Sequence, residues 1–232
     1  VSMPKERLDK MLSNLGYCSR SELRKNLGRV TVNGTVPRKA DEKAEWFEVT
    51  WDGEPVDPDP LWILLHKPEG LTCSHKDVGR LVFEMFPERY LLRKPALSTV
   101  GRLDRDTTGV LLLTTDGGAL HRLTSPKSQI DKVYRVDLLD APEELHLQQL
   151  RQGGGMLEDD DKPLLPCAVE KTGERQVTMT LHEGRYHQVK RMWAALGNPV
   201  EKLHRTRFHR FEVEDLAVGA YRLLTAEESA DL

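Results

Sequence analysis

Cysteine is scarce in this sequence, and its few positions exclude the two structures that cysteines most often build. Cys18, Cys73 and Cys167 are odd in number and far apart, so neither a disulfide framework nor a zinc site is indicated. Long apolar runs are missing too, since none approaches the roughly 18 residues that span a bilayer. Residues 1–6 also lack the apolar core of a signal peptide. We therefore expect a cytoplasmic protein without a metal or a membrane partner.

A general excess of basic charge is also lacking, which argues against a uniformly basic nucleic-acid-binding protein. The 34 Lys and Arg face 37 Asp and Glu over 232 residues, a net charge of −3. The charges are nevertheless segregated. Residues 5–40 hold nine basic against three acidic side chains, residues 184–210 hold seven against one, and residues 41–60 hold one against eight. Two basic segments in one chain favour a polyanionic partner such as RNA.

Two short helices are predicted near the beginning of the chain. Helical spacing predicts a first helix that ends near Gly16, with one apolar face formed by Leu8, Met11, Leu12 and Leu15. Ser19 followed by Glu22 fits a capping box, which predicts a second helix over residues 20–27 that Gly28 ends. Arg20, Arg24 and Lys25 lie on this second helix. They are candidate RNA-binding residues, although a charge run of this kind can also be a solvated helix face.

Strand and turn signals complete a small N-terminal domain. Asn33-Gly34 predicts a tight hairpin turn between strands at 30–32 and 35–36, and another strand is expected at 46–51. Residues 57–60, Asp-Pro-Asp-Pro, are typical of a semi-rigid extended linker. We therefore divide the chain into a domain at 1–56, a linker at 57–60 and a second domain at 61–232.

The second domain alternates apolar strand-like runs with polar loops. The runs span residues 62–65, 109–115, 133–139, 168–171 and 177–181. They predict an α+β domain built on a mixed, mostly antiparallel sheet with flanking short helices. Residues 153–161 join three glycines to four acidic residues, which is typical of a mobile surface loop.

A polar segment directly before an apolar strand is a candidate catalytic loop. Residues 101–109 combine charged side chains, threonines and glycines, and Asp104 lies between Arg102 and Arg105. Nearby cations keep a carboxylate ionised and able to act as a nucleophile. A simple loop salt bridge would use the same residues. Composition leaves the two interpretations open.

The motifs of the N-terminal domain resemble those of the S4 RNA-binding domain over residues 5–52. The resemblance lies in Arg7-Leu8-Asp9-Lys10, in Ser19-Arg20-Ser21 and in Val30-Thr31-Val32-Asn33-Gly34. It implies a small α/β domain that binds RNA.

Three motifs of the second domain resemble those of pseudouridine synthases of the RsuA and RluA type. Residues 101–109 resemble the family's catalytic loop, which implies that Asp104 is the nucleophile. Lys132-Val133-Tyr134 resembles the segment whose tyrosine packs against the flipped base, and Glu183 to Met192 resembles the motif whose final cation, here Lys190, pairs with the nucleophile. Residues 66–70 resemble the opening strand, although His66 replaces the usual asparagine.

The resemblance implies a cofactor-free isomerase that flips a uridine out of RNA. The implied RNA-binding residues of this domain are Arg102, Arg105, Arg185, His187 and Arg191. An S4-like domain before such a catalytic domain is similar to the RsuA branch, which modifies ribosomal RNA at single sites. We expect a monomer that acts on 16S RNA in a small-subunit assembly intermediate. A 23S enzyme, a non-catalytic assembly factor and a metal-independent hydrolase are the alternatives.

Overall fold

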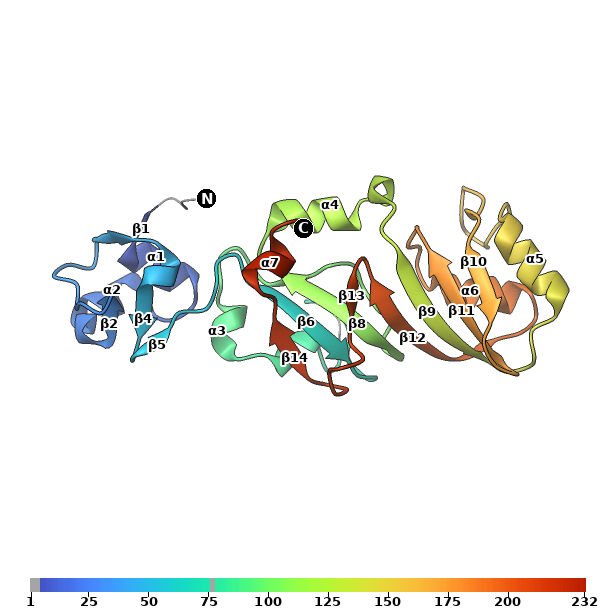
Figure 1. The fold of residues 1–232 in the computed structure, drawn as a ribbon, viewed down its shortest axis with the longest axis horizontal. Coiled ribbons are helices and arrows are strands. Elements are labelled where there is room, and N and C mark those ends of the chain that lie inside the picture. Colours follow the sequence, from blue (N-terminus) through green and yellow to red (C-terminus); the bar gives the residue numbers. More distant parts are fainter. Residues whose placement is uncertain (1–4, 76–77) are drawn as a thin grey trace.

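The computed structural model describes residues 5–75 and 78–232, and it is elongated (Figure 1). A small group of elements at one end of the long axis is followed by one large sheet. The first group contains α1 (Leu8–Asn14) and α2 (Arg20–Lys25). It also contains two small antiparallel sheets, formed by β1 (Glu6–Arg7) with β3 (Lys43–Ala44), and by β2 (Val30–Val32), β4 (Val49–Trp51) and β5 (Glu54–Pro55). Its apolar core is separate from that of the large sheet.

The first helix and the cap of the second form as predicted. All four apolar residues of the first helical stripe are buried in the N-terminal core. Ser19 accepts a hydrogen bond from the Glu22 amide at 3.3 Å, and the Glu22 carboxylate accepts one from the Ser19 amide at 2.7 Å. The predicted end of α2 is wrong. The helix stops at Lys25, because the backbone of Asn26 leaves the helical region and a 3₁₀ turn (Leu27–Arg29) follows.

The predicted hairpin is right about the turn and wrong about its second strand. Asn33 and Gly34 both have positive φ, and Val32 and Thr35 exchange backbone hydrogen bonds across them. Residues 35–36 form no strand: Thr35 makes only an isolated bridge to Val32, and the strand that pairs along β2 is β4. The strand expected at 46–51 begins only at Val49, after a 3₁₀ turn (Trp46–Glu48).

Residues 57–60 are held by polar contacts from both sides. The Asp57 carboxylate accepts hydrogen bonds from Tyr17 at 2.9 Å, from Arg89 at 2.6 Å and from Tyr90 at 3.1 Å. Burial opposes ionisation of this carboxyl, but the hydrogen bonds from Arg89 and Tyr17 outweigh it and lower its pKa. The segment therefore fastens the N-terminal elements to α3 (Glu88–Leu91) as well as joining them along the chain.

Among the residues that the structure describes, the large sheet has nine strands and is mixed. Its main path is β10-β11-β9-β12-β8-β6-β14, with β7 (Ser98–Thr99) on β8 and β13 (Phe211–Glu212) on β12. Only β12 and β8 are parallel among these described pairs, so the predicted mixed and mostly antiparallel sheet is confirmed. The main-path strands are β6 (Trp62–Lys67), β8 (Thr107–Thr114), β9 (Lys132–Leu138), β10 (Ala168–Lys171), β11 (Gln176–Leu181), β12 (Val200–Phe208) and β14 (Tyr221–Leu223).

Side-chain alternation places separate cores on the two faces of this sheet. On β6, Ile63 and Leu65 join one core while Trp62 and Leu64 join the other, as a period of two requires. The first face carries α5 (Glu144–Gln152), α6 (Gln188–Ala195) and a 3₁₀ turn (Val82–Met85). The second carries α4 (Gly117–Thr124). The remaining elements are a 3₁₀ turn (Pro126–Ser128) and α7 (Ala226–Ser229). In the part of the chain that the structure describes, no helix has the length and apolarity of a membrane span.

A histidine pair on the sheet, with His66 buried and His204 half-buried, predicts a pH-dependent stability. His204 bonds Thr108 at 2.7 Å and lies 5.4 Å from the His66 ring. Burial, with Arg135 and His66 nearby, lowers the pKa of His204 to about 4, so between pH 6.5 and 4 the unfolded chain binds a proton that the folded chain excludes. We expect stability to fall as the pH falls through this window. Denaturant unfolding of the wild type and of His204→Gln at pH 7 and pH 5 measures the effect, and equal pH dependence in both proteins would contradict it.

Candidate active site

A cavity opens where β8, β9 and β12 meet the loops before and after them. Its volume is about 540 Å³, within the range of sites that bind small ligands. Residues 101–105 border it on one side and residues 181–189 on the other, while Tyr134, Leu203 and Arg205 contribute from the sheet. Within residues 5–75 and 78–232, no cluster of His, Cys, Asp and Glu is arranged to hold a metal ion.

A buried lysine holds the backbone of the candidate catalytic loop. Lys67, at the end of β6, is 0% exposed, and its Nζ donates to the carbonyls of Asp104 at 3.1 Å and Thr107 at 2.9 Å. Burial lowers the pKa of Lys67, while Cys73, Asp106 and Asp104 partly restore it. This role of Lys67 was not predicted from the sequence. The sequence offered one signal: Lys67 is a cation at the end of a strand that begins with four apolar residues, Trp62 to Leu65.

Loss of the Lys67 ammonium is expected to slow the reaction without preventing folding. Lys67→Met keeps the apolar stem but leaves the loop carbonyls without their donor, so Asp104 can shift from its productive position. A displacement of about 1 Å costs on the order of 100-fold in rate. Single-turnover pseudouridine formation measures the loss, and Lys202→Met, at an exposed position on β12, serves as the control. Equal rates in both variants would show that the loop holds its shape without Lys67.

The Asp104 carboxylate lies in a compact group of charges. The Lys190 ammonium is 3.2 Å from Asp104, the His187 ring is 3.4 Å away, and the Asp104 side chain is 24% exposed. Lys190 also bonds Asp106. Burial disfavours the Lys190 charge, but the hydrogen bond to Asp106 and the charge of Asp104 outweigh it and raise the Lys190 pKa. A fixed cation therefore faces Asp104, as the family resemblance implied.

The other residues singled out from the sequence separate into two places. Tyr134, Arg102, Arg105, Arg185 and His187 line the cavity that contains Asp104. The basic residues of α2 lie on the separate N-terminal group of elements. Tyr134 is 9% exposed and stands opposite Arg205 on β12.

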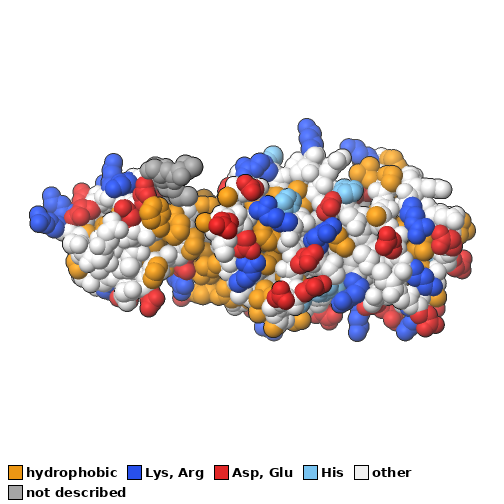
Figure 2. Space-filling model, viewed as in Figure 1, with side chains coloured by type: hydrophobic (Ala, Val, Ile, Leu, Met, Phe, Trp, Pro, Cys, Tyr) orange, Lys and Arg blue, Asp and Glu red, His pale blue; other side chains and the backbone are white. Residues whose placement is uncertain are grey.

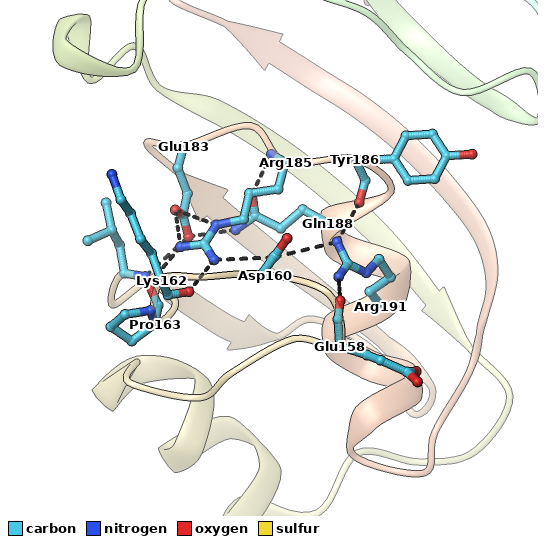
Figure 3. A network of polar contacts seen from close by, with 10 residues as sticks. Glu158, Asp160, Lys162, Pro163, Glu183, Arg185, Tyr186, Gln188 and Arg191 are labelled. Carbon is cyan, nitrogen blue, oxygen red and sulfur yellow. Dashed lines mark hydrogen bonds and ion pairs between the residues drawn. The ribbon is translucent and has the colours of Figure 1, made fainter.

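The acidic segment at 153–161 is a loop, as predicted, but it is tethered to the 183–191 segment (Figure 3). Arg185 contacts Asp160 at 3.2 Å, Glu183 at 2.9 Å and the carbonyls of Lys162 and Pro163 at 2.6 Å. Arg191 donates to the carbonyls of Tyr186 and Glu158. These contacts occupy the Arg185 guanidinium within the protein, so they support a structural role for it. Direct binding of RNA by Arg185 and Arg191 stays a prediction.

One exposed aromatic at the cavity was missed. Tyr186 is 75% exposed and points away from the network around Arg185 (Figure 3). Its ring stacks on His187 with centroids 3.8 Å apart. An exposed ring of this kind can stack with a nucleic-acid base. The sequence did offer a signal, because Tyr186 stands between Arg185 and His187, which were both assigned to the motif.

Comparisons with known proteins identify relatives of this chain. The family described as RNA pseudouridylate synthase matches residues 61–195. The ribosomal small subunit pseudouridine synthase A of Pasteurella multocida is 43% identical over 97% of this chain and 98% of its own length, and that of Escherichia coli K12 is 39% identical over 97% and 99%. A crystal structure of a pseudouridylate synthase aligns with a TM-score of 0.68 and 35% identity over 96% of this chain and 97% of that one.

The chain therefore belongs to the RNA pseudouridylate synthase family. It has the mixed-sheet fold of that family and is an isomerase that forms pseudouridine in RNA.

Proposed function

We propose that this enzyme isomerises a uridine of small-subunit ribosomal RNA and that Asp104 is its nucleophile. The main support is the position of Asp104 at the 540 Å³ cavity, with the Lys190 ammonium 3.2 Å from its carboxylate. A uridine inside folded RNA reaches this carboxylate only after it leaves its stack, at a cost of a few kcal/mol. In this proposal Tyr134, which lines the same cavity, packs against the flipped base.

The proposed reaction conserves all atoms and electrons. The Asp104 carboxylate bonds to the sugar C1′ or to uracil C6, and the N1–C1′ bond breaks with its electron pair passing to the uracil. The ring turns and C5 bonds to C1′. For attack at C1′ the bond to Asp104 breaks in this step, and for attack at C6 it breaks when C5 loses its proton and the C5=C6 double bond is restored. C5 then gives up its proton with the help of Tyr134, while N1 gains one. No electron donor or acceptor enters, so the chemistry requires no cofactor.

The names of the relatives support the choice of RNA. Proteins of about 40% identity over nearly their whole length are ribosomal small subunit pseudouridine synthases. We therefore infer 16S RNA in a small-subunit assembly intermediate as the substrate, a cytoplasmic location and a monomeric enzyme. Residues 1–56 act in this proposal as an S4-like RNA-binding domain. On the face that Figure 2 displays, the outer end of this domain carries Lys and Arg side chains.

Tritium release from uridine C5 tests the substrate. Small and large ribosomal particles are labelled at uridine C5 in cells that lack pseudouridine synthases, and each is incubated with the enzyme. Release from small particles supports the proposal, and release from large particles alone would assign a 23S target. Binding of either particle without release would leave an assembly factor as the function.

The basic residues of α2 are expected to affect RNA binding more than chemistry. Arg20, Arg24 and Lys25 are exposed, so replacing all three with glutamate removes a phosphate-binding face and spares the N-terminal core. We expect kcat/KM to fall at least about tenfold while the rate at saturating RNA changes little. A triple change of the exposed acids Asp41, Glu42 and Glu54 to lysine is the control. Equal KM values for the wild type and the α2 variant would place the RNA elsewhere.

A further inference from the structure

An arginine of the central strand is buried in the active site without an acidic partner. Arg205 on β12 is 1% exposed and lines the cavity. Its Nε donates to the Val110 carbonyl at 2.9 Å, and its guanidinium lies 4.9 Å from the centre of the Phe208 ring. Its Nη2 is buried and has no hydrogen-bond partner in the part of the chain that the structure describes. Among those same residues no ion pair to Arg205 is formed.

Such an arrangement is costly unless a ligand completes it. A buried charge needs compensation, and a buried donor without an acceptor costs about 1–3 kcal/mol. The neighbouring strand β8 carries a second buried polar group without a partner. Thr107 Oγ1 is buried and forms no hydrogen bond within the described residues, and Thr107 lines the same cavity. β8 and β12 pair with Leu203 opposite Thr107 and Arg205 opposite Gly109. Two polar groups without partners therefore come from adjacent strands to one cavity.

We propose that Arg205 is the group that stabilises negative charge on the uracil ring during the reaction. When the N1–C1′ bond breaks, the electron pair passes to the ring and spreads to its carbonyl oxygens. Attack at C6 also places negative charge on the ring and O4. A permanent cation held beside the cavity stabilises either anion, and a cation already in place needs no reorganisation as the charge forms. Tyr134 stands opposite Arg205 on the paired strand β9, so the proposed base-packing ring and the cation belong to one part of the sheet.

This role differs from that of Lys190. Lys190 lies against the Asp104 carboxylate, so it acts on the attacking group. Arg205 acts on the leaving group. Its contribution to the reaction rate should therefore be smaller when the uracil ring itself carries negative charge more readily. The inference rests on the proposed attack by Asp104. The role of Arg205 can still be tested separately, because its effect on the rate should change with the leaving group.

The test compares two RNA substrates under single-turnover conditions at saturating enzyme. One carries uridine at the target position, and the other carries 5-fluorouridine, whose ring carries negative charge more readily. Arg205→Met is expected to slow consumption of uridine by about 100-fold, the usual effect of removing one fixed charge-stabilising donor. We expect a clearly smaller deficit, about tenfold, with 5-fluorouridine. Binding of RNA should stay within about threefold of the wild type.

Four further variants make the result decisive. Arg205→Lys keeps a charge and should lose less than Arg205→Gln, and this pair replaces Arg205→Met if that variant fails to fold. Arg175→Met is the matched control, because Arg175 donates to the Leu139 carbonyl on an exposed loop. Equal deficits with uridine and 5-fluorouridine in a folded variant would assign Arg205 a structural role and overturn the inference. Asp104→Asn runs in parallel: failure of the wild type itself, or full activity of Asp104→Asn, would instead refute the proposed function.

Discussion

Replacing Asp104 by asparagine is expected to remove the isomerase activity while leaving the fold and RNA binding intact. The amide has nearly the same shape but is not a nucleophile, so no covalent step can begin. Removal of a nucleophile from an enzyme that works through a covalent intermediate typically costs at least about 10⁴-fold in rate. Tritium release from uridine C5 of small ribosomal particles measures the loss, and a gel-shift titration measures the affinity for RNA.

The neighbouring carboxylate supplies a control for the charge change. Asp106 also contacts Lys190, and its side chain is 71% exposed compared with 24% for Asp104. The hydrogen bond from Lys190 lowers the Asp106 pKa, so the Asp106 carboxylate carries charge at neutral pH. Asp106→Asn therefore removes the same charge from the same lysine and should cost less than about tenfold. Comparable losses in the two variants would mean that charge near Lys190, and not attack by Asp104, explains the effect.

Local signals in the sequence predicted the elements that depend on local contacts. The apolar stripe of α1, the Ser19 cap of α2 and the Asn33-Gly34 turn all form. Each of them depends on residues that lie only a few positions apart in the sequence. The errors lie where distant pairing decides the structure. β2 takes β4 as its partner and leaves residues 35–36 outside the sheet.

The central strand β12 was missed because one of its three buried residues, Arg205, is charged. Lys202, Arg205 and Arg207 interrupt the alternation, and the segment was interpreted as a basic surface. Arg205 nevertheless faces the protein interior, which composition cannot reveal. The same is true of Lys67, whose carbonyl partners belong to a loop 37 to 40 residues further along the chain. The burial of such cations depends on contacts between distant parts of the sequence, so it can be seen only in the folded sheet.

The proximity of Asp104 and Lys190 was predicted by resemblance, not by spacing. Asp104 precedes β8 and Lys190 lies in α6, so no periodicity connects them. The catalytic roles of Asp104, Tyr134 and Lys190 stay proposals for the experiments above. The structure contributes the distances that make those roles chemically reasonable, and it adds Lys67, Tyr186 and Arg205 to the site.

Among substitutions that add one methyl group to the sheet, Gly109→Ala is expected to destabilise the folded protein most. Gly109 has φ of +112°, a region that residues with a Cβ rarely adopt. A Cβ there would lie 2.1 Å from the Arg205 carbonyl oxygen on the paired strand β12. Backbone atoms cannot rotate away as a side chain can, so the parallel pairing of β8 and β12 must open. Overpacking and backbone strain together should cost at least about 3 kcal/mol of unfolding free energy.

Thermal and denaturant unfolding measure this loss, and Gly117→Ala is the matched control. Gly117 begins α4 in the same domain, its φ is not positive, and nothing lies within 4 Å of its added Cβ. Alanine should be neutral or slightly stabilising there, whereas 3 kcal/mol at Gly109 corresponds to a fall of about 6–12 °C in Tm. Because the displaced strand carries Arg205, folded Gly109→Ala should also isomerise uridine more slowly. Unchanged Tm in both variants would mean that the two strands lie further apart than the structure places them.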